Sequence, residues 1–289
     1  MNRRIAVAAA FAVLSVASAY AQVTDFFALV QTGTPQQIQA AVDQGANAKA
    51  QDSQGRTPLM VAAQNNQDPE VITTLLKAGS DINARDVNGY TALTYAVWHN
   101  SGLGVIDAFL NAGIDINGDA GYGVSYLMVA AQHNPNPAVI VRLLKAGSNV
   151  NFREPDAGVT PLLAAASDNK NAAVIDLLIK AGANINAQTV NSQTALILAA
   201  ESNPNPEVIT ALINAGLNVE TRDSLGRTPL MRAAAKNPNP DAIIVLLKVG
   251  ADAKAKDNEG KTAFDYAKTN YSLRVSGADA YRQLQDASR

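Results

Sequence analysis

Apolar and polar positions come in blocks that return at a fixed interval along most of the chain. A short apolar run that begins at residues 57–59 (Thr-Pro-Leu) is followed by a polar loop and then by a second apolar stretch, residues 71–76, with helical spacing. This pattern predicts a pair of short helices joined by a tight loop.

The predicted helix pair repeats through the chain. Thr-Pro-Leu returns in the same or a similar form at spacings of 34, 34, 35, 34, 34 and 34 residues, and a glycine follows six of these anchors after 22 residues. Such repeats form stacked arrays because one unit cannot bury its own apolar face. The anchors are Thr57, Thr91, Ser125, Thr160, Thr194, Thr228 and Thr262, and the glycines are Gly79, Gly113, Gly147, Gly182, Gly216 and Gly250.

The residues of each repeat predict where its first helix begins and ends. Threonine or serine caps the helix, and the proline that often follows suits the first helical position, where no N–H is needed. Ala62 and Ala63 and their equivalents give a small-residue face that lets neighbouring helices approach closely. An asparagine nine residues after six anchors is expected to end the helix, since asparagine tolerates the left-handed conformation. These asparagines are Asn66, Asn100, Asn134, Asn169, Asn203 and Asn237.

The second helix is predicted to start at a cap followed by proline, as at Asp68 and Asn136, and to stop at the recurring glycine. After it we expect a short extended stretch, such as residues 81–83, and a turn, such as residues 86–89 (Asp-Val-Asn-Gly), because Asp and Gly are typical turn residues. The recurring aspartates Asp52, Asp86, Asp223 and Asp257 are interpreted as turn-forming residues.

With these features the sequence resembles the ankyrin repeat family, and in particular an exported, bacterial-type member of it. The matching motifs are the Thr-Pro-Leu helix start, the Ala-Ala pair, the leucines of the second helix, Ala-Gly-x-Asp/Asn-Ile/Val-Asn and the Asp-x-x-Gly turn, from about Thr24 to Tyr266. The resemblance implies an all-α, ankyrin-type solenoid of stacked helix-turn-helix repeats with short hairpin loops. It also implies protein binding on a concave surface formed by the turn tips and the ends of the first helices.

Three departures from the family pattern stand out. The period is 34 residues rather than 33. The histidine common after Thr-Pro-Leu is replaced, for example by Met60 and Thr94, so other groups must satisfy the loop contacts. Ser192 stands where the other turns carry glycine, and the loop of residues 148–159 has one extra residue.

The N-terminal residues predict a targeting segment. Arg3 and Arg4 precede an apolar stretch, residues 5–16, and Ala-Tyr-Ala at 19–21 is typical of a signal-peptidase site. An uncleaved membrane anchor is the alternative, but residues 5–21 are at the short limit for a span of about 20 residues. We expect residues 1–21 to be a cleaved signal peptide, the mature chain to have no membrane span, and the protein to be periplasmic or extracellular.

The remainder is expected to divide into three parts. These are an N-terminal capping repeat (22–56), six ankyrin-type repeats (57–261), and a C-terminal capping repeat with a terminal helix (262–289). Terminal repeats of such arrays need a polar outer face. Ser276 and Asp279 resemble a capping box that would start the last helix.

Composition excludes several classes of function. The formal net charge is −2 and there is no basic run, so we expect no nucleic-acid partner. The absence of cysteine excludes disulfides and thiolate chemistry. Two histidines could bridge a metal, but the sequence offers no third ligand and no nucleophile–base set, so we expect no metal, no cofactor and no catalytic residue.

One group of residues breaks the repeat pattern. His99 and His133, the only histidines, lie eight residues after adjacent anchors, and Trp98 is the only tryptophan. Tyr90 and Tyr122 come from the turns of the same two repeats. Since Trp and Tyr dominate interface hot spots, these five residues are the predicted partner-binding residues. The alternative is that exposed helix ends simply vary.

Two further tyrosines of these repeats, Tyr95 and Tyr126, are interpreted as packing residues. The function we expect is that of a non-catalytic, monomeric protein-binding scaffold acting after export. An inhibitor or immunity protein that blocks a partner enzyme would present the same surface chemistry. A hydrolase using Asp and His groups is a third hypothesis, against which the lack of a convergent triad weighs heavily.

Overall fold

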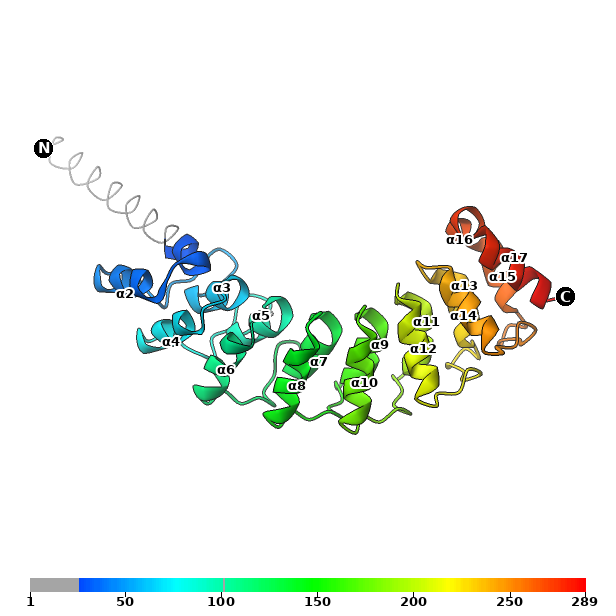
Figure 1. Cartoon of the computed structure of the whole chain (residues 1–289), viewed down its shortest axis with the longest axis horizontal. Coiled ribbons are helices and arrows are strands. Elements are labelled where there is room, and N and C mark those ends of the chain that lie inside the picture. Colours follow the sequence, from blue (N-terminus) through cyan, green and yellow to red (C-terminus); the bar gives the residue numbers. More distant parts are fainter. Residues whose placement is uncertain (1–25, 101) are drawn as a thin grey trace, which may run out of the picture. The chain divides into compact units, whose positions relative to one another are not determined.

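Short helices joined by loops make up the chain (Figure 1), as the computed structural model shows for residues 26–100 and 102–289. The predicted signal peptide, residues 1–21, lies outside the described residues. Within the described ranges no helix is both long enough and apolar enough to cross a membrane.

The chain forms two compact units. Among the described residues, the first comprises 26–100, 102–115 and 120–122, and the second comprises 116–119 and 123–289. Each unit is a stack of helix pairs. Within a unit, the first or inner helix of a repeat packs on the inner helix of the next, and the second or outer helix packs on the next outer helix. This is the all-α, ankyrin-type architecture that the repeat predicts.

In the first unit, residues 26–32 are helical and precede the helix α2. The inner helices α3 and α5 pack together, and so do the outer helices α2, α4 and α6. Their bounds are α2 (Pro35–Asp43), α3 (Pro58–Asn65), α4 (Pro69–Lys77), α5 (Ala92–His99) and α6 (Leu103–Asn111).

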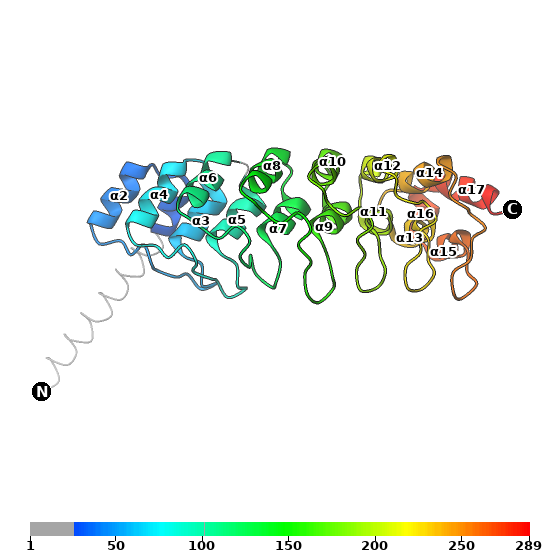
Figure 2. The same cartoon turned by 90° about the horizontal axis from the view of Figure 1, so that it is seen from below.

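The second unit continues the same alternation and ends in two extra helices, α16 and α17. Figure 2 shows that its hairpin turns project side by side, next to the inner helices. The bounds are α7 (Tyr126–His133), α8 (Pro137–Lys145), α9 (Pro161–Asp168), α10 (Ala172–Lys180), α11 (Ala195–Ser202), α12 (Pro206–Asn214), α13 (Pro229–Lys236), α14 (Asp241–Lys248), α15 (Ala263–Thr269), α16 (Tyr271–Ser276) and α17 (Ala278–Ala287).

The predicted helix starts are confirmed. Each of the seven anchors is an N-cap whose hydroxyl accepts the N–H three residues on, as Thr57 does from Met60 at 3.4 Å. In three repeats, the residue that replaces the family histidine completes the cap; these residues are Met60, Thr94 and Met231. The sulfur of Met60 accepts the Thr57 N–H at 3.3 Å, and the Thr94 hydroxyl donates to the Ala120 carbonyl at 2.6 Å.

The prediction that the recurring asparagines end the inner helices in a left-handed conformation was wrong. All six are extended, with φ between −92° and −59° and ψ between 122° and 133°. The side chains of Asn66, Asn100, Asn169, Asn203 and Asn237 bond to the preceding repeat instead. The Asn203 amide donates to the carbonyls of Ala166 and Asn169, at 3.0 and 2.9 Å, and its oxygen accepts the Asn205 N–H at 2.9 Å.

Two other local predictions were also wrong. Residues 81–83 form a turn, in which the Asp81 side chain accepts the Asn83 N–H at 2.9 Å, and not an extended stretch. Ser276 does not cap the last helix, because it is the final residue of α16; Gly277 is the N-cap of α17 and makes no side-chain bond.

The hairpins follow the predicted turn chemistry. Asp86 accepts the N–H groups of Asn88 and Tyr90 at 2.8 and 2.9 Å, and equivalent bonds form at the other recurring aspartates. In the loop with the extra residue, Glu154 replaces aspartate and reaches the N–H groups of Asp156 and Ala157. Four pairs of consecutive turns are joined at their tips by backbone hydrogen bonds, for example by the Ser224 N–H bonding to the Asn191 carbonyl at 3.0 Å.

Candidate functional site

In the first unit, α5 and the turns on either side of it gather five aromatic side chains. Tyr90 is the last turn residue before the cap Thr91, and Tyr122 lies in the following turn. Tyr95, Trp98 and His99 lie on α5 at spacings of three and four residues, which place them on one face of the helix. We call Tyr90, Tyr95, Trp98, His99 and Tyr122 the aromatic cluster.

Tyr90 is the centre of the aromatic cluster. Its ring meets Tyr95, Trp98 and Tyr122 edge to face, with centroid distances of 6.2, 5.7 and 5.6 Å. The ring quadrupoles favour this geometry over face-to-face stacking, so the cluster is held together by specific contacts. His99 lies flat against Trp98, with centroids 5.1 Å apart and an interplanar angle of 6°.

Tyr95 fixes the base of the cluster. Its hydroxyl donates to the carboxylate of the buried Asp86 at 2.6 Å. Burial, followed by this bond, raises the pKa of Tyr95 well above its usual value, so the phenol remains a hydrogen-bond donor at physiological pH. Tyr95, interpreted from the sequence as a packing residue, is thus half-buried and part of the cluster, whereas Tyr126 is buried as predicted.

Tyr122 is held out into solvent by an unusual backbone. Its side chain is 68% exposed and its φ is 53°, in the left-handed region that bulky residues seldom adopt. Gly121, at φ 120°, lets the chain pass close to the cluster, because a Cβ there would lie 2.6 Å from the Tyr90 ring. An exposed aromatic ring in a strained turn is the type of feature found at functional sites.

His99 lies at the exposed edge of the aromatic cluster. Partial burial lowers the pKa of its imidazole below the usual value, because burial disfavours the charged form. His99 is therefore neutral at physiological pH, and it extends the flat surface of Trp98 instead of contributing a positive charge.

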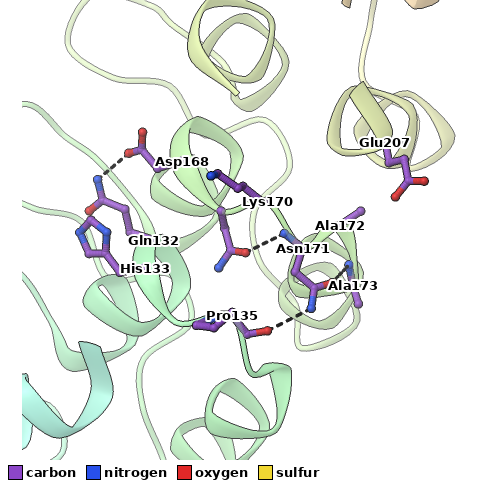
Figure 3. Close-up of a pocket in the computed structure, with 10 residues that line it drawn as sticks. Gln132, His133, Pro135, Asp168, Lys170, Asn171, Ala172, Ala173 and Glu207 are labelled. Atoms are coloured by element: carbon purple, nitrogen blue, oxygen red, sulfur yellow. Dashed lines mark hydrogen bonds between the residues drawn. The ribbon is translucent and has the colours of Figure 1, made fainter. Parts of the chain in front are cut away.

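His133 belongs to the second unit and lies exposed at the C-terminal end of α7. It lines a hollow of about 740 Å³ together with Gln132, Asp168, Lys170 and Glu207. In Figure 3, Gln132 and His133 lie on one side of this hollow and Glu207 on the other, and Gln132 donates to Asp168 at 2.6 Å. That His133 shares a binding surface with the aromatic cluster stays a prediction.

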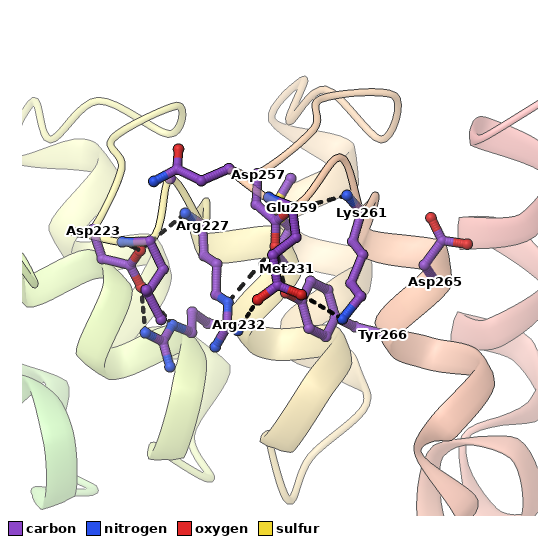
Figure 4. A network of polar contacts seen from close by, with 12 residues as sticks. Asp223, Arg227, Met231, Arg232, Asp257, Glu259, Lys261, Asp265 and Tyr266 are labelled. Carbon is purple, nitrogen blue, oxygen red and sulfur yellow. Dashed lines mark hydrogen bonds and ion pairs between the residues drawn. The ribbon is translucent and has the colours of Figure 1, made fainter.

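A charged network in the second unit was not predicted from the sequence. Arg232 on α13 forms ion pairs with the fully buried carboxylate of Asp223 and, at 3.3 Å, with Glu201 on α11. Further along the same face, the Arg227 guanidinium lies 5.1 Å from the centroid of the Tyr266 ring (Figure 4). These contacts cross between repeats.

A signal for these contacts is present in the sequence. The fourth residue after the anchor is polar where it bonds to the turn aspartate nine residues earlier, and this holds for the pairs Asp86–Tyr95, Asp223–Arg232 and Asp257–Tyr266. Where the turn lacks that aspartate, the fourth residue is apolar, as at Val129 and Leu198. Asp52 is an exception, because it pairs with Arg56 instead, at 2.8 Å.

The arrangement of these groups suits binding. The turn aspartates use their oxygens on backbone N–H groups and neighbouring side chains, as the turn interpretation predicts. Among the described residues, no three His, Cys, Asp or Glu side chains gather so as to hold a metal ion. What the first unit presents instead is a fixed, partly exposed aromatic surface.

Stacked helix pairs with hairpin turns define the class of helical-repeat proteins. The comparisons give the family: a model of ankyrin repeats in three copies matches residues 26–119 and 127–223, and a model of ankyrin repeats in many copies matches residues 212–267. The chain therefore belongs to the ankyrin repeat family, whose repeats generally mediate protein–protein binding. The comparison with curated proteins finds no match.

Proposed function

We propose that this protein is a non-catalytic, exported binding scaffold whose protein partner docks on the aromatic cluster of the first unit. The observation that carries the proposal is the cluster itself. It joins the chain's only tryptophan to three tyrosines and a neutral histidine through ring contacts, on a chain with only 5% aromatic residues.

The energetics of interfaces support this choice. Tyr and Trp provide large, rigid contact areas and lose little conformational entropy on binding. Here the rings are already fixed against one another, and Ala96 and Val97 of the same helix α5 are fully buried. A partner that covers this surface gains contact area without having to order it.

The N-terminal sequence supports the export of the protein. Arg3, Arg4, the apolar stretch and the Ala-Tyr-Ala site support a signal peptide over residues 1–21. We therefore look for the partner in a periplasmic or extracellular fraction. A bacterial source is part of the same proposal.

The test is a substitution of Trp98. Trp98→Ala should weaken partner binding by about 2 kcal/mol or more, because it removes the largest ring of a hot-spot candidate. The partner is captured from the exported fraction with the wild-type protein, identified by mass spectrometry, and titrated calorimetrically against each variant.

Gln64 provides the matched control, since it occupies the same position on the preceding inner helix α3. Gln64→Ala should leave the affinity nearly unchanged. Equal affinities for Trp98→Ala and the wild type would remove the aromatic cluster as the docking site. Loss of helical circular dichroism in Trp98→Ala would instead assign Trp98 to the core.

A further inference from the structure

The ring of Tyr122 differs from the other rings of the cluster. Tyr95 is tied to Asp86, and Trp98 is stacked on His99, but the Tyr122 side chain is 68% exposed beyond its edge contact with Tyr90. An exposed tyrosine face carries the negative pole of the ring quadrupole, which attracts cations.

The charge of the first unit also favours a cation. Its described residues include four Lys or Arg and eight Asp or Glu, whereas those of the second unit include seventeen and sixteen. The electrostatic potential around the aromatic cluster is therefore negative. It would attract basic groups toward the cluster and repel anionic ones. One acidic residue, Asp86, lies directly against the cluster, where its carboxylate accepts the Tyr95 hydroxyl.

In the second unit, the aromatic rings of the inner helix α15 lie next to cations of the same chain. Arg227 and Lys261 lie 5.1 and 6.0 Å from the centroid of the Tyr266 ring, and Lys268 lies 4.8 Å from that of Phe264. Tyr266 holds the position in α15 that Tyr95 holds in α5. The rings of Tyr266 and Phe264 thus pair with cations supplied by the chain.

We propose that the aromatic cluster binds an arginine or lysine side chain from a basic segment of the protein partner, with the cation over the exposed ring of Tyr122. This inference rests on the proposed function and specifies the chemistry of the partner. Tyr90 and its contacts orient the Tyr122 ring, and the acidic unit supplies the long-range attraction.

The experiment uses two synthetic peptides with blocked ends, an arginine octamer and a citrulline octamer. Citrulline has nearly the shape of arginine without its charge. At physiological ionic strength, the arginine peptide should bind in calorimetric titration and shift the emission of Trp98, the only tryptophan of the chain. The citrulline peptide should do neither. Equal binding of both peptides would overturn the proposal.

Two variants test the ring of Tyr122. Tyr122→Gly removes the ring and suits the positive φ, so the turn should keep its fold. It should bind the arginine peptide about three- to thirtyfold more weakly, the range expected for one cation–π contact. Tyr122→Phe keeps the ring face and should bind nearly as the wild type does.

Tyr271→Ala is the control for non-specific attraction, because Tyr271 is 76% exposed in the second unit, and it should change nothing. Unchanged peptide affinity in Tyr122→Gly would overturn the cation site. If Trp98→Ala loses the captured partner while Tyr122→Gly binds partner and peptide normally, the proposed function stands and the cation site falls. If peptide binding depends on Tyr122 while Trp98→Ala keeps the partner, the cation site stands and the proposed docking site falls.

Discussion

One backbone position in each hairpin requires a left-handed residue. Six of the seven turns place glycine there, with φ between 70° and 79°, and the seventh places Ser192 at 59°. A non-glycine residue in this conformation costs roughly 1–2 kcal/mol. Ser192, which stands where the other turns carry glycine, is therefore locally strained. The hydroxyl of Thr189 accepts backbone N–H groups of the same turn and helps to hold this conformation.

This strain can be measured with a reciprocal pair of substitutions. Ser192→Gly should raise the free energy of unfolding by up to about 1 kcal/mol, since the relief of strain exceeds the extra chain entropy of glycine. Gly260→Ser should lower it by about 1–2 kcal/mol, because φ is 79° and no atom lies within 4 Å of the added Cβ. Urea unfolding of both variants gives the values. A stability loss in Ser192→Gly would show that the serine hydroxyl stabilises the turn.

Residues whose role is local were predictable from the sequence. The threonine caps and the turn aspartates act within four residues of themselves, so their spacing was sufficient evidence. The recurring asparagines were misassigned because the partners of five of them lie 33 to 38 residues earlier, in the preceding repeat. The period at which a residue recurs does not show whether its side chain bonds within its own repeat or to the neighbouring repeat.

At the scale of elements, five of these asparagines, Asn66, Asn100, Asn169, Asn203 and Asn237, link a repeat to the one before it. Each of these amides spans the end of the preceding inner helix and the start of its own outer helix, so it satisfies carbonyls that helix ends leave without partners. The side chain is buried in the process, and Asn203 is 0% exposed. Removing one amide therefore leaves several buried polar groups unsatisfied.

Asn203→Ala should lower the free energy of unfolding by about 2–4 kcal/mol, because two donated bonds and one accepted bond are lost inside the fold. Asn214→Ala, at the exposed end of α12, is the control and should stay within about 0.5 kcal/mol of the wild type. Urea unfolding followed by circular dichroism measures both. A loss below 1 kcal/mol in Asn203→Ala would mean that water replaces the amide.

The C-terminal elements show why the last repeat was harder to predict. No Asn-Pro start follows α15, and Asn270 instead caps the six-residue helix α16 by accepting the Leu273 N–H at 3.1 Å. The same amide still donates to the Ala234 carbonyl of the preceding repeat at 3.0 Å. Asn270 thus preserves the hydrogen bond to the preceding repeat, while the short helix α16 replaces the regular outer helix.

At the scale of the whole molecule, the sequence predicted the fold class but only part of the candidate site. Tyr90, Trp98, His99 and Tyr122 meet in the first unit because the repeat brings adjacent turns and inner helices together. The role of Tyr95 depends on its bond to Asp86, and the position of Tyr122 depends on Gly121. Neither dependence follows from composition or period.

Below neutral pH, four carboxylates and one histidine make the stability of the molecule depend on pH in one direction. Burial tends to raise the pKa of Asp52, Glu154 and Asp257, but hydrogen bonds from backbone N–H groups and neighbouring side chains lower it below its usual value. Backbone and side-chain bonds from Thr262 and Lys268 lower the pKa of Asp265 from 3.8 to about 2. Burial lowers the pKa of His99.

Each of these shifts favours the deprotonated form in the folded state, so the unfolded chain takes up more protons as the pH falls. The carboxylates stabilise the fold above their unfolded pKa values, and this contribution is lost as the pH drops through the folded values, from about 4 toward 2. His99 adds an earlier loss of stability that begins as the pH falls through about 6.5. The free energy of unfolding should therefore decrease in two stages on acidification.

Urea unfolding across this pH range, with His99→Gln and Asp265→Asn, separates the two stages. His99→Gln should flatten the profile between about pH 7 and 5 and leave the acidic stage intact. Asp265→Asn should reduce the loss of unfolding free energy in the acidic stage by about 1 kcal/mol. The effect is no larger because the Asp265 side chain is 40% exposed and solvent screens its interactions. A protein that gains stability on acidification from pH 7 would contradict the direction of every one of these shifts. An unchanged profile in His99→Gln would show that the stacked imidazole is as well solvated in the folded chain as in the unfolded one.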